Sequence, residues 1–150
     1  MEEMADLALA ADPGEAERPA LVPYFDGERT PDLPDATGSL LGLRNDTSRE
    51  AIALAAHDGV LGGLIAGRDA LRSAGVSADG RVFLVGGGAR SPAYRQRLAD
   101  LLGDAVRVPH EDESVASGAA VQAAVVAGAG GFGDVAQRWA LDSATELNPR

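Results

Sequence analysis

The chain has 150 residues, of which 45% are hydrophobic, 24% are charged and only 4% are aromatic. This length suits a single domain with a buried core, and the hydrophobic content excludes a disordered chain. The net charge of −10 argues against binding to nucleic acid or to anionic membranes, which attract basic surfaces. The absence of cysteine excludes disulfides and cysteine-based metal centres.

All 13 basic residues are arginines. The absence of lysine excludes a P-loop lysine, a protein-kinase strand lysine and Schiff-base chemistry. Any nucleotide phosphate must therefore be held by backbone N–H groups, arginine or a metal ion. Met1–Ala11 is acidic and unlike a signal peptide, and no apolar stretch reaches transmembrane length, so we expect a soluble, cytoplasmic protein.

The sequence of residues 1–42 predicts little regular structure. Residues 1–18 form an acidic, alanine-rich segment, in which Met1–Glu17 indicates a frayed helix that ends at Pro13-Gly14. Pro19–Phe25 predicts a short edge strand, because its two prolines do not suit a central strand. Asp26–Gly42 predicts a turn-rich loop, and loops of this length usually carry a function or contact a partner.

A long helix follows. Thr47 and Glu50 form a capping box, the helix runs to Ser73, and Gly75 suits its C-terminal cap. Four internal glycines each destabilise such a helix, which suggests close backbone packing on a sheet or a second domain. Two helices broken at Gly62-Gly63 are the alternative. The apolar residues that recur at helical spacing are Ile52, Ala56, Val60, Leu64 and Leu71.

The central segment runs from a strand through glycines into a helix. Val82–Val85 predicts a buried strand, and Gly86-Gly87-Gly88 allows a sharp turn that another molecule can approach closely. Ser91 and Pro92 then open a helix that closes at Gly103. This arrangement offers free N–H groups to an anion, usually a phosphate. A plain strand-to-helix turn is the alternative.

The remaining elements complete an α/β order. Ala105–Pro109 predicts a second strand, and a helix runs from Ser114 to Ala127. The carboxylates of Glu111-Asp112-Glu113 suit the start of this helix, and a metal site is the alternative. Gly128–Gly133 is interpreted as a linker and Asp134–Leu141 as a terminal amphipathic segment.

A long helix, strand, helix, strand and helix indicate an α/β fold with parallel pairing in a small, incomplete sheet. His57 and His110 lack metal-ligand spacing and are expected to be surface or hydrogen-bonded histidines. Glu28 and Arg29 are expected to form an ion pair that holds their loop or a domain boundary, and contact with a substrate is the alternative.

Four stretches together resemble the C-terminal domain of the FGGY carbohydrate kinases, most closely the xylulokinase group. They are LVPYFDGERTP, GSLLGL with its capped helix, GGGARSPAYRQRLADLLG and ESVASGAAVQAA. The resemblance implies a partial ribonuclease H-like (actin-like ATPase) domain over residues 19–128, followed by a tail over residues 129–150. It also implies ATP as cofactor, with Mg²⁺ on the phosphates, and phosphorylation of D-xylulose at its 5-hydroxyl.

By this resemblance, the turn at Gly86, Gly87 and Gly88 approaches the nucleotide. Ala89, Arg90 and Ser91 lie near it at the start of the helix. The resemblance assigns no catalytic residue and no metal ligand to this chain, because the family's first domain and its catalytic aspartate have no counterpart here.

The chain alone is therefore expected to be inactive and to meet the sugar only when the missing domain is supplied. A non-catalytic interaction module with a retained fold is one alternative. Another is a fragment of a related kinase acting on glycerol, gluconate or another pentose. Uncovered sheet edges and helix faces also predict self-association.

Overall fold

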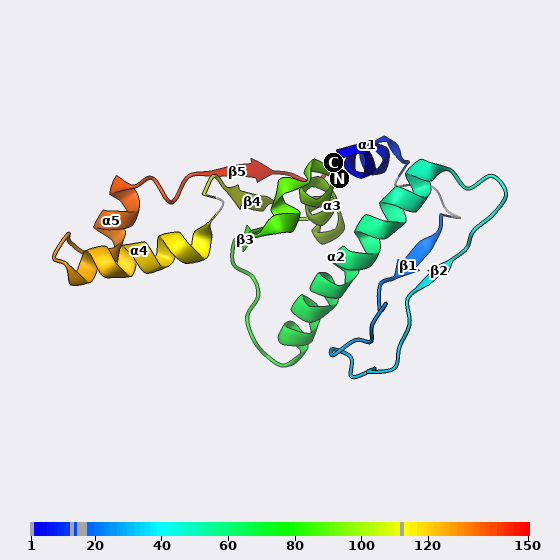
Figure 1. Cartoon of the computed structure of the whole chain (residues 1–150), viewed down its shortest axis with the longest axis horizontal. Coiled ribbons are helices and arrows are strands. Elements are labelled where there is room, and N and C mark those ends of the chain that lie inside the picture. Colours follow the sequence, from blue (N-terminus) through cyan, green and yellow to red (C-terminus); the bar gives the residue numbers. More distant parts are fainter. Residues whose placement is uncertain (1, 13, 15–17, 112) are drawn as a thin grey trace.

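The computed structural model describes residues 2–12, 14, 18–111 and 113–150. They form an α/β structure with a small hydrophobic core and a helical hairpin at one end (Figure 1). In chain order the elements are α1 (Glu2–Ala10), β1 (Ala20–Val22), β2 (Ser39–Leu41), α2 (Arg49–Ser73), β3 (Val82–Phe83), the 3₁₀ turn η1 (Gly87–Arg90), α3 (Pro92–Leu102), β4 (Val106–Pro109), α4 (Ser114–Val126), α5 (Phe132–Arg138) and β5 (Ala144–Leu147).

The described strands form two small sheets. β1 pairs with β2 in antiparallel fashion, with Leu21 opposite Leu40. In the second sheet, β4 lies between β3 and β5. β3 is parallel to β4, as predicted, and β5 is antiparallel to β4. The sequence did not predict β5, which lies in the segment interpreted as a tail.

α2 is a single helix of 25 residues, so the alternative of two helices is wrong. Its predicted N-cap at Thr47 is also wrong. The Ser48 hydroxyl accepts a hydrogen bond from the Ala51 N–H at 3.0 Å, while the Thr47 hydroxyl accepts one from the Arg44 N–H at 2.8 Å. Thr47 therefore closes the turn before the helix, and Ser48 caps the helix itself.

The C-terminal end of α2 confirms the role of Gly75. This residue has a φ of +82°, and its N–H donates to the Arg72 carbonyl at 2.9 Å. The following N–H, of Val76, donates to the Leu71 carbonyl at 3.0 Å. These two bonds form a Schellman motif, for which glycine is the favoured residue.

The buried face of α2 differs from the apolar series seen in the sequence. Leu54 and Leu61 point into the core, whereas Val60 and Leu64 are 46% and 54% exposed. Among the four glycines, Gly59 packs tightly, because a Cβ there would lie 2.4 Å from the Leu21 carbonyl oxygen. A Cβ at the other three would meet nothing within 4 Å (Gly62, Gly63 and Gly67).

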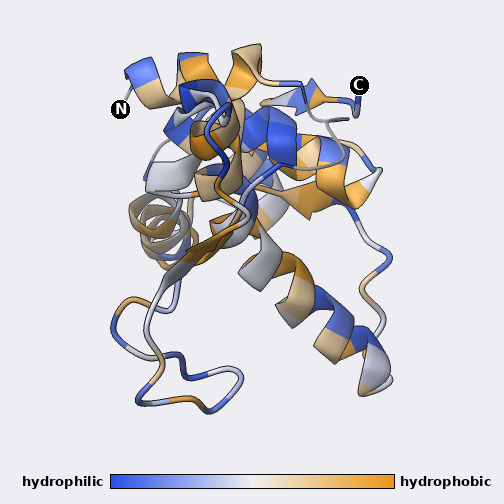
Figure 2. Cartoon of the chain, turned by 90° about the vertical axis from the view of Figure 1, so that its right-hand side faces the viewer, coloured by the Kyte–Doolittle hydropathy of each residue, from blue (hydrophilic) through white to orange (hydrophobic). Residues whose placement is uncertain are grey.

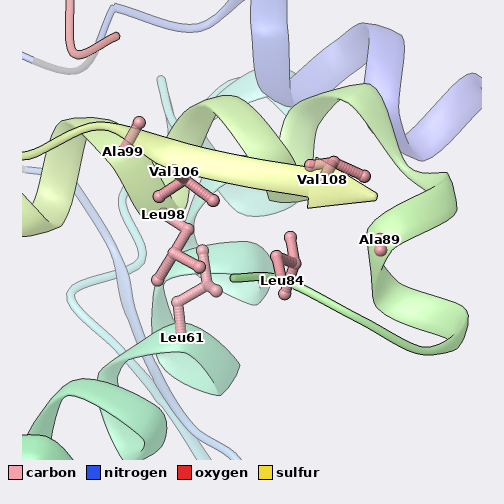
Figure 3. Close-up of a cluster of buried hydrophobic side chains, with 7 residues drawn as sticks. All are labelled: Leu61, Leu84, Ala89, Leu98, Ala99, Val106 and Val108. Carbon is pink, nitrogen blue, oxygen red and sulfur yellow. The ribbon is translucent and has the colours of Figure 1, made fainter. Parts of the chain in front are cut away.

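The main hydrophobic core lies between α2, α3 and the β3–β4 pair (Figure 3). Its buried members are Leu61, Leu84, Ala89, Leu98, Ala99, Val106 and Val108. A second cluster of alanines joins α1 to α2 and α3, with Ala5, Ala8, Ala53 and Ala93 almost fully buried. Small side chains allow these helices to approach closely. The main core includes Leu84 and Ala89, which flank Gly86–Gly88, so the core contacts both ends of the glycine turn.

α4 and α5 form a hairpin that extends away from this core (Figure 1). α4 matches the predicted helix, but Val121 is its single buried residue, and Val115 and Val126 are each 89% exposed. The lower end of α2 also extends away from the other helices (Figure 2). The molecule thus exposes apolar residues on two separate helices.

α2 is long and apolar enough, by length and composition alone, to cross a membrane. The expectation that no stretch reaches this length is therefore wrong. In the structure α2 packs against α1, β1 and α3, and core helices of soluble proteins meet the same criterion.

Candidate functional site

The predicted strand before the glycines is shorter than expected. β3 ends at Phe83, although the Leu84 N–H still donates to the Arg107 carbonyl of β4 at 2.9 Å. Leu84 is buried in the core and Val85 is 54% exposed. The chain leaves the sheet at Gly86, whose φ of +88° is a conformation that favours glycine.

The glycines then lead into the tight turn η1 rather than an open loop. The Ala89 N–H donates to the Gly86 carbonyl at 3.0 Å, and the Ser91 N–H donates to the Gly88 carbonyl at 3.1 Å. The first N–H groups of such a turn have no acceptor inside it. Gly86, Gly87 and Gly88 are exposed, so their backbone is accessible to a ligand.

The predicted start and end of α3 are confirmed. The Ser91 hydroxyl accepts a hydrogen bond from the Tyr94 N–H at 3.3 Å, and Pro92 occupies the first helical turn. Gly103 closes the helix with a φ of +62°. The N-terminus of α3 therefore lies directly after the glycine turn and adds a partial positive charge there.

The other predicted site residues occupy different environments. Arg90 is exposed at the end of η1. Ala89 is 7% exposed and packs in the core, so its side chain faces the core. Ser91 is half-buried and its hydroxyl caps α3. The nucleotide contacts of these residues stay a prediction.

Two side chains of α3, missed by sequence reasoning, support the turn. Tyr94 lies against Gly88, where a Cβ would be 3.0 Å from the Tyr94 ring atom Cε1. Burial of the Tyr94 ring raises the pKa of its hydroxyl. Arg95 Nε donates a hydrogen bond to the Ala89 carbonyl oxygen. Helical side chains lean toward the helix N-terminus, which was the available signal for both contacts.

A small hollow lies between η1 and the carboxyl ends of β3 and β4. Gly86, Ala89, Arg95, Pro109 and Glu111 are among its lining residues. Its volume of about 10 Å³ is room for one water molecule at most. The hollow is thus too small for a nucleotide, and the exposed glycines of the turn face solvent outside it.

A larger cavity of about 430 Å³ lies elsewhere, between α1, α2 and α3. It is lined by Leu54, Gln96, Arg97 and Asp100 among others, and not by the glycine turn. Arg97 is buried there and donates to both carboxylate oxygens of Asp58, at 2.9 and 3.0 Å. This cluster joins α2 to α3 and is separate from the candidate site.

The histidines are hydrogen-bonded, as predicted. His57 Nδ1 lies 2.8 Å from the Ala53 carbonyl oxygen, and His110 Nε2 lies 3.0 Å from Thr145 Oγ1. Of the predicted carboxylate run, Glu111 Oε1 accepts from the Glu113 N–H at 2.9 Å, and Asp112 lies outside the described residues. Within the described ranges, no three potential ligand side chains gather as a metal site.

Among the described residues, no direct ion pair joins the side chains of Glu28 and Arg29, although the charge of Arg29 is the smallest of the causes that lower the pKa of Glu28. Glu28 Oε1 instead accepts hydrogen bonds from the N–H groups of Arg29 and Thr30, at 2.7 and 3.0 Å. These bonds, that of Thr30 above all, hold the pKa of the Glu28 carboxyl below its ordinary value. Backbone amides therefore make the hydrogen bonds to this carboxylate, and the charge of Arg29 adds a smaller electrostatic contribution.

Comparison with known proteins shows which family this chain resembles. The family model for the C-terminal domain of the FGGY family of carbohydrate kinases matches residues 1–127. The xylulose kinase of Streptomyces rubiginosus is 43% identical over 119 residues, which are 79% of this chain and 25% of that protein.

Solved structures extend the similarity to the fold. The xylulose kinase of Bifidobacterium adolescentis matches with a TM-score of 0.66 and 46% identity, over 85% of this chain and 25% of that one. A Plasmodium falciparum glycerol kinase solved with ADP matches with a TM-score of 0.83 and 22% identity, over 99% of this chain and 29% of that one. The expected α/β, actin-like ATPase fold with an incomplete sheet is confirmed.

The chain thus spans about a quarter of the length of the xylulose kinases that it matches. Its family match covers most of its own length and includes the whole glycine turn. The chain belongs to the FGGY family of carbohydrate kinases, within which it corresponds to the C-terminal domain.

Proposed function

We propose that this chain supplies the nucleotide side of an ATP-dependent sugar kinase, with Gly86–Ser91 holding ATP or ADP. The observation that carries the proposal is the exposed glycine turn between β3 and the N-terminus of α3. Backbone N–H groups and a helix N-terminus at one point attract phosphate. The family relationship supports ATP as the nucleotide.

The proposed sugar is D-xylulose, phosphorylated at its 5-hydroxyl to give D-xylulose 5-phosphate and ADP in the cytoplasm. The xylulose kinase relatives support this substrate. Gluconokinase and glycerol kinase relatives also match, so gluconate, glycerol or another pentose is the alternative. Mg²⁺ would be carried by the nucleotide phosphates. The division of the chain at residues 18 and 128 stays a prediction.

Phosphoryl transfer to a sugar needs a positioned base and an in-line acceptor beside the phosphates. Gly86–Ser91 contain neither, since they offer backbone N–H groups, one guanidinium and one hydroxyl. We therefore expect the 150-residue chain to bind nucleotide without turnover. The sugar and the base would come with the remainder of the kinase fold.

Calorimetric titration with ADP and MgCl₂ tests the nucleotide proposal. Gly87→Val should raise the Kd for ADP at least about tenfold, because a branched side chain would cover the N–H groups of the turn. A Cβ at Gly87 meets nothing within 4 Å, so the variant should keep its Tm. Gly80→Val is the matched control, since Gly80 is equally open and lies before β3. Equal ADP affinity in all three proteins would contradict the proposal.

A non-catalytic interaction module is the second candidate, favoured by the exposed apolar residues of α2 and α4. It predicts no heat of ADP binding to the wild-type chain under conditions where the protein is folded. A coupled assay with D-xylulose and ATP addresses completeness, because turnover by the purified chain would contradict the expectation that it is inactive alone.

A further inference from the structure

Arg95 connects α3 back to the glycine turn. It lies in the first turns of α3, and its Nε donates to the carbonyl oxygen of Ala89 in η1. The N–H of the same Ala89 donates to the Gly86 carbonyl at 3.0 Å. Ala89 is thus hydrogen-bonded on one side to the Arg95 side chain and on the other to Gly86, so it links the two.

The other restraints on the turn fall on its second half, where Ala89 packs in the core and Tyr94 lies against Gly88. A Cβ at Gly86 or Gly87 would meet nothing within 4 Å, so no neighbouring side chain packs against them. Glycine also loses more conformational freedom on ordering than any other residue. A directional bond to the middle of this segment therefore removes motion that the glycines themselves permit.

The Arg95 side chain approaches the turn from the side of the small hollow. Arg95 lines this hollow together with Gly86, Pro109 and Glu111, while the turn exposes its glycines to solvent. None of the ion pairs between described residues involves Arg95. Among the described residues, the one hydrogen bond of its side chain is the bond to Ala89, which makes support of the turn the distinctive contact of this side chain.

We propose that Arg95 is a positioning residue that preorganises the glycine turn for a nucleoside diphosphate. This inference rests on the proposed function of the turn. A preformed site binds more tightly than one that must be ordered during binding. Arg95 acts through the Ala89 carbonyl, and the exposed N–H groups of the turn make the contacts to the phosphate.

The test compares Arg95→Met and Arg95→Lys with the control Arg138→Met. Arg138 also donates to a backbone carbonyl, that of Ala129 at 3.0 Å, but outside the candidate site. Amide hydrogen exchange over residues 86–91 reports on the turn, and calorimetry with ADP and MgCl₂ reports on binding. We expect Arg95→Met to accelerate exchange over 86–91 and to raise the Kd about tenfold, and Arg138→Met to do neither.

Arg95→Lys separates positioning from charge. Lysine keeps the positive charge and most of the aliphatic stem but lacks the Nε–H group, so positioning predicts fast exchange and weak ADP binding. Rescue of ADP affinity by lysine with exchange still fast would overturn the proposal in favour of direct charge attraction. Unchanged exchange in both variants would overturn it as well.

The two readouts also separate this proposal from the proposed function. If the wild-type chain binds no ADP, the nucleotide proposal fails, and exchange alone decides whether Arg95 orders the turn. If Arg95→Met is unfolded by circular dichroism, the comparison of Arg95→Lys with wild type carries the test.

Discussion

Arg97 carries its guanidinium into the interior, with the side chain 8% exposed, and ties Asp58 of α2 to α3. We expect Arg97→Met to lower the free energy of unfolding by about 2–3 kcal/mol, because it leaves carboxylates in a partly buried site. The loss stays moderate because Arg18 Nη1 still lies 3.0 Å from Asp58 Oδ2, although without a well-directed hydrogen bond. Urea unfolding measures the difference.

Arg107→Met is the matched control. Arg107 Nε lies 2.8 Å from Glu146 Oε2, but these side chains are 37% and 45% exposed. Solvent screens such a pair, so its loss should change the unfolding free energy by less than about 1 kcal/mol. Similar losses for both arginines would show that burial does not set the strength of the Arg97 pair.

Glu28 provides a pH-dependent contact in the loop between β1 and β2. The N–H groups of Thr30 and Arg29 favour its charged form and hold its pKa below the ordinary 4.5. This carboxylate therefore stabilises the loop above pH 4.5, and the contribution is lost as the pH falls through the lowered pKa. NMR titration should follow this midpoint in the amide shifts of Arg29 and Thr30. Glu28→Gln should abolish the shift, whereas a wild-type midpoint at or above 4.5 would refute this account.

At the scale of elements, the glycines of α2 separate into a packed position and open ones. Gly59→Ala should destabilise the chain by about 1–3 kcal/mol, because the new Cβ would press on the Leu21 backbone. Gly63→Ala faces open space and should be neutral or stabilising by up to about 1 kcal/mol, from its higher helix propensity. Urea unfolding of the pair provides the comparison, and equal effects would mean that α2 and β1 do not meet at Gly59.

Local signals in the sequence located most elements, because they act over a few residues. The capping serine, Pro92 and Gly103 fixed α3, and Gly75 fixed the end of α2. The start of α2 was displaced by one residue, because Thr47 and Ser48 both suit an N-cap and the earlier turn takes the threonine.

Contacts between distant segments could not be predicted in this way. β5 has a short ATEL sequence with a weak strand pattern, and it pairs with β4, which lies far from it in the sequence. The apolar series on α2 correctly predicted helix but not which face is buried, since Leu54 and Leu61 are the buried leucines and Leu61 packs with α3 and the sheet. Within the candidate site, the glycine turn could be recognised, whereas the support by Tyr94 and Arg95 depends on side-chain direction.

At the scale of the whole molecule, the described chain has a closed end and an open one. At the closed end, the C-terminal segment returns to α3. There the Arg150 N–H donates to Asp100 Oδ1 and Gln96 Nε2 donates to the Asn148 carbonyl, both at 3.0 Å. At the other end, the α4–α5 hairpin leaves large apolar side chains uncovered. Burial of these side chains would be favourable wherever a complementary surface is available.

This open end predicts self-association of the chain in solution. Val115 and Val126 are each 89% exposed and Phe132 is 61% exposed, so their burial between copies would release water from apolar surface. Sedimentation velocity over a wide concentration range should show a sedimentation coefficient that rises with concentration. The double variant Val115→Ser and Val126→Ser should reduce this rise with little loss of monomer stability, because neither side chain is buried in the monomer.

The matched control Leu71→Ser changes an exposed apolar residue of α2, 53% exposed and away from the hairpin. A wild-type chain that remains monomeric throughout would contradict the prediction. If Leu71→Ser reduced association as much as the double variant, the hairpin would not be the specific contact.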